Sequence, residues 1–176
     1  LFDKDNPIVE PIWTYNAGTD LHNVVISSDG NYITALDSMG VVYFFDKNSS
    51  TPLWSYDVEG SCDGTLTISS DGEYIALGCY HYGQSSGNVF LFNKNSSTPL
   101  WSYGTEDTIL ESGISISADG QYIAVGSTSG HLYFFDKNSS LPLWYYDTGT
   151  EVTTVSISAD GKYISAAENC PGCSDR

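Results

Sequence analysis

The stretch GVVYFFDKNSSTPLWSY at residues 40–56 decides the fold, because close copies return at residues 87–103 and 130–146. A related version, LFDKDNPIVEPIWTY, occupies residues 1–15. Each copy has an apolar run, a polar turn that contains Pro, and a second run that carries Trp. Four related copies in a chain of 176 residues indicate a repeat architecture.

A second repeated element lies between these copies and has the form VVISSDGNYITAL, which begins at Val24. Its turn glycines are Gly30, Gly72, Gly120 and Gly161. They are 42, 48 and 41 residues apart, and one four-stranded propeller blade has roughly 40 to 50 residues. Gly supplies the positive φ of the Ser-x-Asp-Gly turn, and the Asp side chain can bond back to the turn backbone. Each repeat therefore contains two hairpins, which makes four strands.

The run VVYFFD at residues 41–46 is apolar on both faces, because alternate residues of a strand point to opposite sides. Such a strand needs a sheet above and a sheet below it. We predict a single all-β domain over residues 1–176, a β-propeller built of about four four-stranded antiparallel blades. The expected repeats cover residues 16–57, 58–104 and 105–147, and the last covers residues 148–176, completed by residues 1–15.

The two ends of the chain align with the same strand of the repeat. Residues 172–176 match the beginning of the strand that starts at Gly40, and residues 1–4 match its last part. The blades could form a four-bladed ring closed by the termini, or a slice of a larger propeller that a further array or another copy completes. We expect the slice, because natural termini seldom divide a strand so evenly.

The composition excludes several classes of partner. Six basic and 22 acidic residues give a formal net charge of −16, which repels phosphate backbones and anionic membrane surfaces. We expect no nucleic-acid partner. No apolar run approaches the roughly 18 residues of a membrane span. There is no initiator Met or signal peptide, so we expect a processed product or a fragment.

The repeat resembles that of pyrroloquinoline-quinone-like β-propellers. The resemblance rests on the pattern of Gly40, Val42, Tyr43, Asp46, Leu53, Trp54 and Tyr56. It implies that the tryptophans pack between neighbouring blades, namely Trp13, Trp54, Trp101 and Trp144. The Ser-x-Asp-Gly-x-Tyr-Ile hairpin is also similar to hairpins of WD-repeat-like and TolB-like propellers. Asn-Ser-Ser replaces the usual Thr-Gly turn, and no calcium-ligand or vicinal-disulfide motif of the quinoprotein dehydrogenases is found, so we expect no catalytic residue, no metal and no cofactor.

Three N-x-Ser sequons lie in the same turn of successive repeats, at Asn48, Asn95 and Asn138. We hypothesise that they carry N-glycans if the protein is exported. The alternative is that Asn and Ser are present because they form good turns.

Four cysteines form two pairs in the sequence. Cys62 and Cys79 flank the turn of the second repeat and lie directly opposite each other if residues 69–72 form the loop. We favour a disulfide over two free buried thiols. Cys170 and Cys173 have the spacing of a redox C-x-x-C motif, but a small structural disulfide loop is the favoured interpretation.

The connections opposite the two kinds of turn share one side of the propeller and hold eleven of the 22 acids: Asp20, Asp37, Asp57, Glu59, Asp63, Glu106, Asp107, Glu111, Asp147, Glu151 and Glu168. The longest connection contains Tyr80, His81 and Tyr82. Variable loops on a rigid scaffold often bind ligands, and here a cation, a basic protein or a sugar stacked on Tyr would suit. The alternative is a solvated acidic rim with a tolerated insertion.

Neither a phosphate loop, a nucleophile elbow nor an H-E-x-x-H helix is present. We therefore expect a non-catalytic extracellular or cell-surface propeller that acts as a structural, assembly or recognition module. Self-association into a surface layer or filament is a further expectation, since a divided strand leaves an unpaired edge. The alternative is part of a larger quinone-dependent dehydrogenase or other propeller enzyme whose active site lies outside this chain.

Overall fold

The computed structural model describes residues 1–5, 10–60, 62–81, 83, 86–105, 107–110 and 113–169, except for the side chains of Asp63 and His81. Every regular element in these ranges is a β-strand, so the prediction of an all-β chain is confirmed. No helix in the described part of the chain has the length and apolar character to cross a membrane.

Consecutive strands form antiparallel sheets in chain order. The first sheet contains β1 (Leu21–Ile26), β2 (Tyr32–Asp37), β3 (Val41–Asp46) and β4 (Trp54–Asp57). The second contains β5 (Cys62–Ile68), β6 (Tyr74–His81), β7 (Gly87–Asn93) and β8 (Trp101–Thr105). The third contains β9 (Ile114–Ile116), β10 (Tyr122–Gly126), β11 (His131–Asp136) and β12 (Trp144–Asp147). The described part of the fourth has two strands, β13 (Val152–Ile157) and β14 (Ile164–Glu168).

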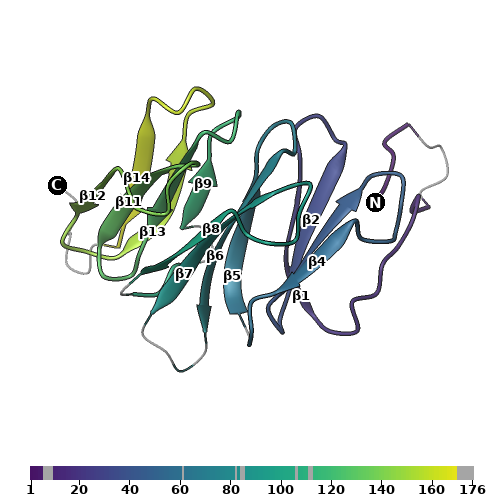
Figure 1. Ribbon diagram of the computed structural model, residues 1–176, viewed down its shortest axis with the longest axis horizontal. Coiled ribbons are helices and arrows are strands. Elements are labelled where there is room, and N and C mark those ends of the chain that lie inside the picture. The colour runs from purple at the N-terminus through teal and green to yellow at the C-terminus, as the bar shows by residue number, and fades with distance from the viewer. Residues whose placement is uncertain are drawn as a thin grey trace.

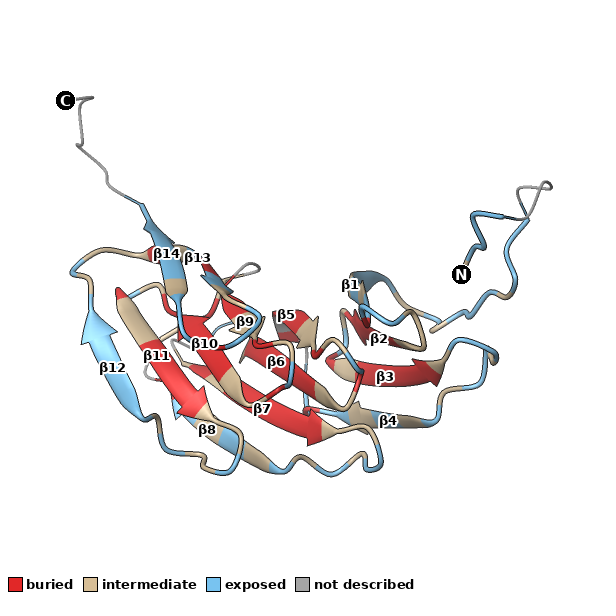
Figure 2. Cartoon of the chain, turned by 90° about the horizontal axis from the view of Figure 1, so that it is seen from above, coloured by how far each residue is buried: buried red, intermediate tan, exposed pale blue. Residues whose placement is uncertain are grey.

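The four sheets stand side by side like the blades of a propeller (Figure 1). Seen from above, they follow an arc with β1, β5, β9 and β13 on its inner side and β4, β8 and β12 on its outer side (Figure 2). β1 and β14, the first and last strands that the structure describes, belong to the sheets at opposite ends of this arc. Of the two expected arrangements, the described sheets therefore show an open array and not a closed ring.

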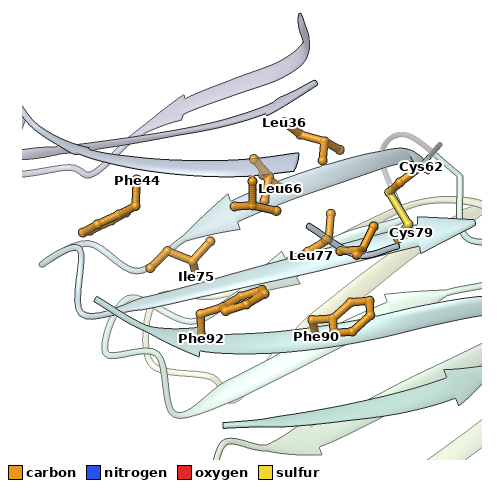
Figure 3. Packing of buried hydrophobic residues seen from close by; sticks show 11 residues of the cluster. Leu36, Phe44, Cys62, Leu66, Ile75, Leu77, Cys79, Phe90 and Phe92 are labelled. Carbon is orange, nitrogen blue, oxygen red and sulfur yellow. A yellow bond between two sulfur atoms is a disulfide. The ribbon is translucent and has the colours of Figure 1, made fainter. Parts of the chain in front are cut away.

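The core lies between the sheets. Leu36 and Phe44 of the first sheet pack against Leu66, Leu77 and Phe92 of the second, and all five side chains are buried (Figure 3). On the opposite face of β3, Tyr43 and Phe45 belong to a separate cluster. The run VVYFFD is thus buried on both faces, as its apolar pattern predicts, and each sheet must have a neighbour on both sides to cover its apolar residues.

The two kinds of turn are held by their own polar side chains. In the first hairpin the Ser27 hydroxyl donates to Asp29, and the Asn31 amide donates to the same carboxylate. These bonds, that from Ser27 first, lower the pKa of Asp29. In the second turn, the Asn48 amide donates to Asp46. The acids of the Asp-Gly turns thus bond to the turn backbone, in agreement with the sequence pattern.

Cys62 and Cys79 form a disulfide, with Cα atoms 5.6 Å apart. They do not lie directly opposite each other as predicted, because Cys79 pairs with Gly64 and Cys62 pairs with His81. The prediction took residues 69–72 as the loop. In the structure Ser69 donates its amide to the carbonyl of Tyr74, which places the register two residues further along. The disulfide therefore joins diagonal neighbours.

Candidate functional site

Three of the four tryptophans bridge to a neighbouring sheet: Trp54 and Trp101 from the outer strands β4 and β8, and Trp13 from the N-terminal segment. Trp54 of the first sheet has its ring centroid 5.6 Å from that of Phe92, and its Nε1 donates to the Lys94 carbonyl at 2.8 Å. The same contacts recur with Trp101, Phe135 and Lys137, and with Trp13, Phe45 and Lys47. In each case the indole N–H donates to a backbone carbonyl of the neighbouring sheet, and this bond fixes the orientation of the Trp ring.

A tyrosine, a glycine and a lysine form a second repeated contact. The ring of Tyr32 lies against Gly72 of the next sheet, where a Cβ atom would come within 2.4 Å of it. Lys94 lies above the same ring, with Nζ 5.1 Å from the centroid, a cation–π distance. Tyr74 makes the same pair of contacts, with Gly120 and Lys137, and Tyr122 lies against Gly161.

The Asp-Gly turns of neighbouring sheets are joined by backbone hydrogen bonds. The Ser70 amide donates to the Ala118 carbonyl at 2.9 Å, and the Ala118 amide donates to the Ala159 carbonyl at 3.0 Å. Between the first and second sheets, the backbone amide of Asp29 donates to the Ser70 carbonyl at 3.2 Å. The sheets are thus connected in series along one side of the arc.

At the N-terminal end of the arc, the apolar side chains of the innermost strand are exposed, namely Leu21, Val24 and Ile26 of β1. Val24 is 58% exposed, whereas Leu66, which holds the same repeat position in the second sheet, is 4% exposed. A groove of about 470 Å³ lies over this surface. We call the surface the N-terminal end face, and its lining residues include Leu21, Val24, Ile26, Ile33, Ala35 and Phe45.

At the other end, aromatic side chains that are covered within the arc are exposed. Tyr163 holds the repeat position of Tyr32 and is 75% exposed. Trp144 stacks on Phe134 of its own sheet at 5.1 Å, yet its outer side faces solvent. We call Trp144, Tyr146 and Tyr163 the C-terminal end face.

The N-terminal segment has the geometry of the outer turn of a blade. The Ile12 amide donates to the Leu1 carbonyl at 2.8 Å, which matches the bond from Leu53 to Phe44 at 2.7 Å in the first sheet. Residues 1–4 align with the end of a strand but form no strand here. The segment packs on the first sheet through Trp13, and β13 and β14 form a two-stranded sheet without it.

The three sequon asparagines are exposed and lie at equivalent positions. Each side-chain Nδ2 donates to the residue two places earlier: Asn48 to Asp46, Asn95 to Asn93 and Asn138 to Asp136. The same atom that a glycan would modify thus also helps to hold the turn. Cys170 and Cys173 lie outside the described residues.

The predicted ligand loop is only partly described. Tyr80 and His81 end β6, so they extend the sheet instead of forming a loop, and Tyr82 lies outside the described residues.

Asp37 was expected on the exposed acidic side but is buried. It accepts from the Tyr43 hydroxyl at 2.9 Å and from two backbone amides. Burial, together with this bond, raises the pKa of Tyr43 above its usual value. Within the described ranges, no three His, Cys, Asp or Glu side chains form a group that could hold a metal.

The family resemblance implied the contacts that Trp13, Trp54 and Trp101 make between sheets, but Trp144 contacts only its own sheet in the described structure. The contacts between the repeated Tyr and the turn Gly of the next sheet were missed. The signal was present, because a Tyr stands two places after the turn glycine in every repeat, as in Gly30 and Tyr32. A spacing alone does not say that the ring covers the glycine of the next blade. That contact appears only when two repeats are placed side by side.

These features define the class of the protein: an open array of β-propeller blades whose exposed end faces are its candidate interaction surfaces. A family model described as outer membrane protein assembly factor BamB matches residues 10–162. The chain therefore belongs to this family of pyrroloquinoline-quinone-like repeat propellers. A search of curated proteins found no match.

Proposed function

We propose that the protein is a non-catalytic extracellular or cell-surface glycoprotein that acts as an assembly or recognition module and binds other proteins through its end faces. The observation that carries this proposal is the exposure of Val24, which is 58% exposed, whereas Leu66 and Ile114 at the same position of the other complete sheets are 4% and 7% exposed. Ile26 beside it is 52% exposed. Large contiguous apolar patches on a folded protein mark interaction surfaces.

The chemistry of the N-terminal end face fits a protein partner. Its groove is lined mainly by aliphatic and aromatic side chains, with Trp13 and Tyr15 at one side. Aromatic residues are enriched at the buried centre of protein interfaces. The description of the matched family also names an assembly factor, which is compatible with a role in binding proteins.

The proposed location rests on two further observations. The sequon residues Asn48, Asn95 and Asn138 are exposed and lie in equivalent turns. The disulfide between Cys62 and Cys79 suits an oxidising compartment. Intact-mass measurement of native material should show added hexose, and its absence would contradict the glycoprotein assignment.

The binding role can be tested with a charge placed on the end face. Immobilised wild-type chain should retain a protein from the cell envelope that the variant Val24→Asp does not retain. The matched control is Ser102→Asp, an exposed strand residue of β8 in the second sheet, outside both end faces. Equal retention by Val24→Asp and wild type would overturn the proposal.

A quinone titration separates this function from the dehydrogenase alternative. A change in absorbance when pyrroloquinoline quinone and calcium are added, together with substrate turnover, would establish the alternative and overturn the non-catalytic assignment. We expect no change.

A further inference from the structure

We infer that the partner of the two end faces is a second copy of this chain, which completes the fourth blade by supplying its outer half. This inference rests on the proposed function, since it names the partner of the same surfaces. It is carried by the repetition of the structure: each contact between neighbouring sheets is made several times within the chain, and both halves of one more such contact are exposed at the two ends of the arc.

The chain contains both an inner half and an outer half for the fourth blade, but they lie apart. The inner half is formed by β13 and β14 at the C-terminal end of the arc. The outer half is the segment of residues 1–15, which already has the hydrogen bond of the outer turn and already docks Trp13 on the next sheet. Figure 2 shows the two halves at opposite ends of the arc, so one chain does not bring its own halves together.

The first contact across the new interface is the tyrosine–glycine–lysine group. Tyr163 of one copy would cover Gly30 of the other, as Tyr32 covers Gly72. At present nothing lies within 4 Å of a Cβ position built on Gly30, so the space for the ring is open. Lys47 would then lie above the ring, in the place that Lys94 holds above Tyr32.

The second contact is the docking of the fourth tryptophan. Phe2 holds the repeat position of Phe45, Phe92 and Phe135, the three rings that receive Trp side chains, and it is 65% exposed. Trp144 of one copy would stack on Phe2 of the other. Its Nε1 would donate to the carbonyl of Lys4, which holds the position of Lys47.

The third contact continues the series of backbone hydrogen bonds between turns. The Ser70 and Ala118 amides each donate to the carbonyl of the next sheet at the equivalent position. The Ala159 amide of one copy would donate in the same way to the Ser28 carbonyl of the other. The three contacts involve separate atoms, yet they all require the same placement of the second copy.

The donor and acceptor surfaces differ, so the contact is heterologous. Such contacts close into a ring when the rotation permits and otherwise continue as a filament. The charge of −16 on each copy opposes the contact at long range, whereas the apolar end faces favour it. Added salt should therefore strengthen the association.

The test is light scattering on the purified 176-residue chain over a range of concentrations and salt. We expect a mass that is a multiple of 19.1 kDa and that rises with concentration and with salt. A mass of 19.1 kDa under all conditions would show that the chain stays a monomer and would overturn the inference. The proposed function would survive if Val24-dependent retention of a different protein were still found.

Two single variants locate the interface. Tyr163→Ala removes the ring at the C-terminal end, and Gly30→Asn fills the space at the N-terminal end with a residue that tolerates positive φ. Each should weaken association by at least about tenfold. The matched controls are Tyr145→Ala, an exposed ring directed at its own sheet, and Gly149→Asn, where φ is +79° and the space is also open.

A mixture of the two variants gives the sharpest result. A Tyr163→Ala chain retains an intact N-terminal end and a Gly30→Asn chain retains an intact C-terminal end, so one good contact forms between them. We expect a one-to-one complex that is limited to two chains. Association of the mixture no stronger than that of either variant alone would contradict a head-to-tail contact.

Discussion

The face of the second sheet that meets the first and the N-terminal end face of the first sheet are built from the same repeat positions but have different surroundings. Leu66 and Ile75 are buried in a cluster that spans two sheets, whereas Val24 at the position of Leu66 is exposed. Gly72 lies against the ring of Tyr32, whereas Gly30 faces open space. The two faces differ in whether a neighbouring blade is present and not in their hydrophobic pattern.

The apolar pattern of a repeat thus defines which residues can be buried. Whether they are buried depends on the presence of a neighbouring blade. A blade alone has two apolar faces and cannot cover either of them. The stabilising contribution of any one side chain should therefore depend on the face to which it belongs. Variants at equivalent positions test this directly.

The largest difference is expected for the phenylalanine that receives a tryptophan. Phe92→Ala removes a buried ring that contacts Trp54 and Tyr56, so the free energy of unfolding should fall by about 3–5 kcal/mol. Phe2→Ala removes an exposed ring at the equivalent position and should change it by less than about 1 kcal/mol in the unassociated chain. Urea denaturation at low protein concentration measures both. Similar losses would show that the end position is also covered.

The disulfide gives the second prediction, because it anchors the inner hairpin of the second sheet. Cys62 and Cys79 are 17 residues apart. Closing a loop of this length lowers the entropy of the unfolded chain and thereby stabilises the folded state by about 3 kcal/mol. The double variant Cys62→Ala with Cys79→Ala should lose approximately this much in urea denaturation. Reductant should destabilise the wild type and leave the double variant unchanged, and a double variant as stable as the wild type would contradict the prediction.

Glycines at equivalent turns give the third prediction. Gly72→Ala and Gly30→Ala share the cost of a side chain at positive φ, near +70° in both. Gly72→Ala also brings Cβ within 2.4 Å of the Tyr32 ring, which adds about 1–3 kcal/mol of overpacking. Thermal unfolding of the unassociated chains should therefore show a lower Tm for Gly72→Ala. Equal values would mean that the ring moves aside without cost.

The fourth prediction isolates a single hydrogen bond. Trp54→Phe keeps a ring on Phe44 but loses the bond from Nε1 to the Lys94 carbonyl, which should cost about 0.5–1.5 kcal/mol and leave that buried acceptor unsatisfied. Trp144 stacks on Phe134 at the same centroid distance of 5.1 Å but is exposed on its other side, so Trp144→Phe serves as the control with a smaller loss. Urea denaturation of the two variants measures the difference, and a larger loss from Trp144→Phe would contradict the assignment.

The sequence predicts well what depends on local chemistry. The strands, both kinds of turn and the two-sided burial of VVYFFD follow from periodicity and from Gly, Asp and Pro at fixed places. The register between β5 and β6 was wrong by two residues, because the number of turn residues outside the ladder cannot be read from the Asp-Gly signal. Asp37 was misplaced for a related reason, since its partner, the Tyr43 hydroxyl, comes from the neighbouring strand.

The end faces could not be predicted as surfaces from one repeat at a time. Val24 and Leu66 have the same surroundings in sequence, so periodicity assigns both to the core. That Tyr163 and the N-terminal segment lie at the two ends of one arc depends on how the sheets pack against one another. The tryptophan contacts were expected only because the repeat resembles that of a known propeller family.

The smallest predicted effect concerns the turn acids, which should behave alike inside the arc and at its end. Asp119 in the third sheet and Asp160 in the fourth each accept from a Ser hydroxyl and from a backbone amide within their own turn. The backbone bond from Gln121, followed by that from Ser117, lowers the pKa of Asp119. The bond from Ser158 is the first cause that lowers the pKa of Asp160, to about 2.

A lowered folded-state pKa means that the carboxylate stabilises the fold above the unfolded value of about 3.9 and that this contribution is lost as the pH falls through the folded value. Asp119→Asn and Asp160→Asn should therefore be slightly less stable than the wild type at pH 6, and the difference should shrink as the pH falls below about 4, for Asp160→Asn until about pH 2. The midpoint of urea denaturation, followed as the pH is lowered, measures this. Because each turn binds its own acid, both variants should lose this difference as the pH falls, although only Asp119 belongs to a complete sheet. A difference that grows below pH 4, or one present in Asp119→Asn alone, would show that the neighbouring blade and not the turn holds the carboxylate.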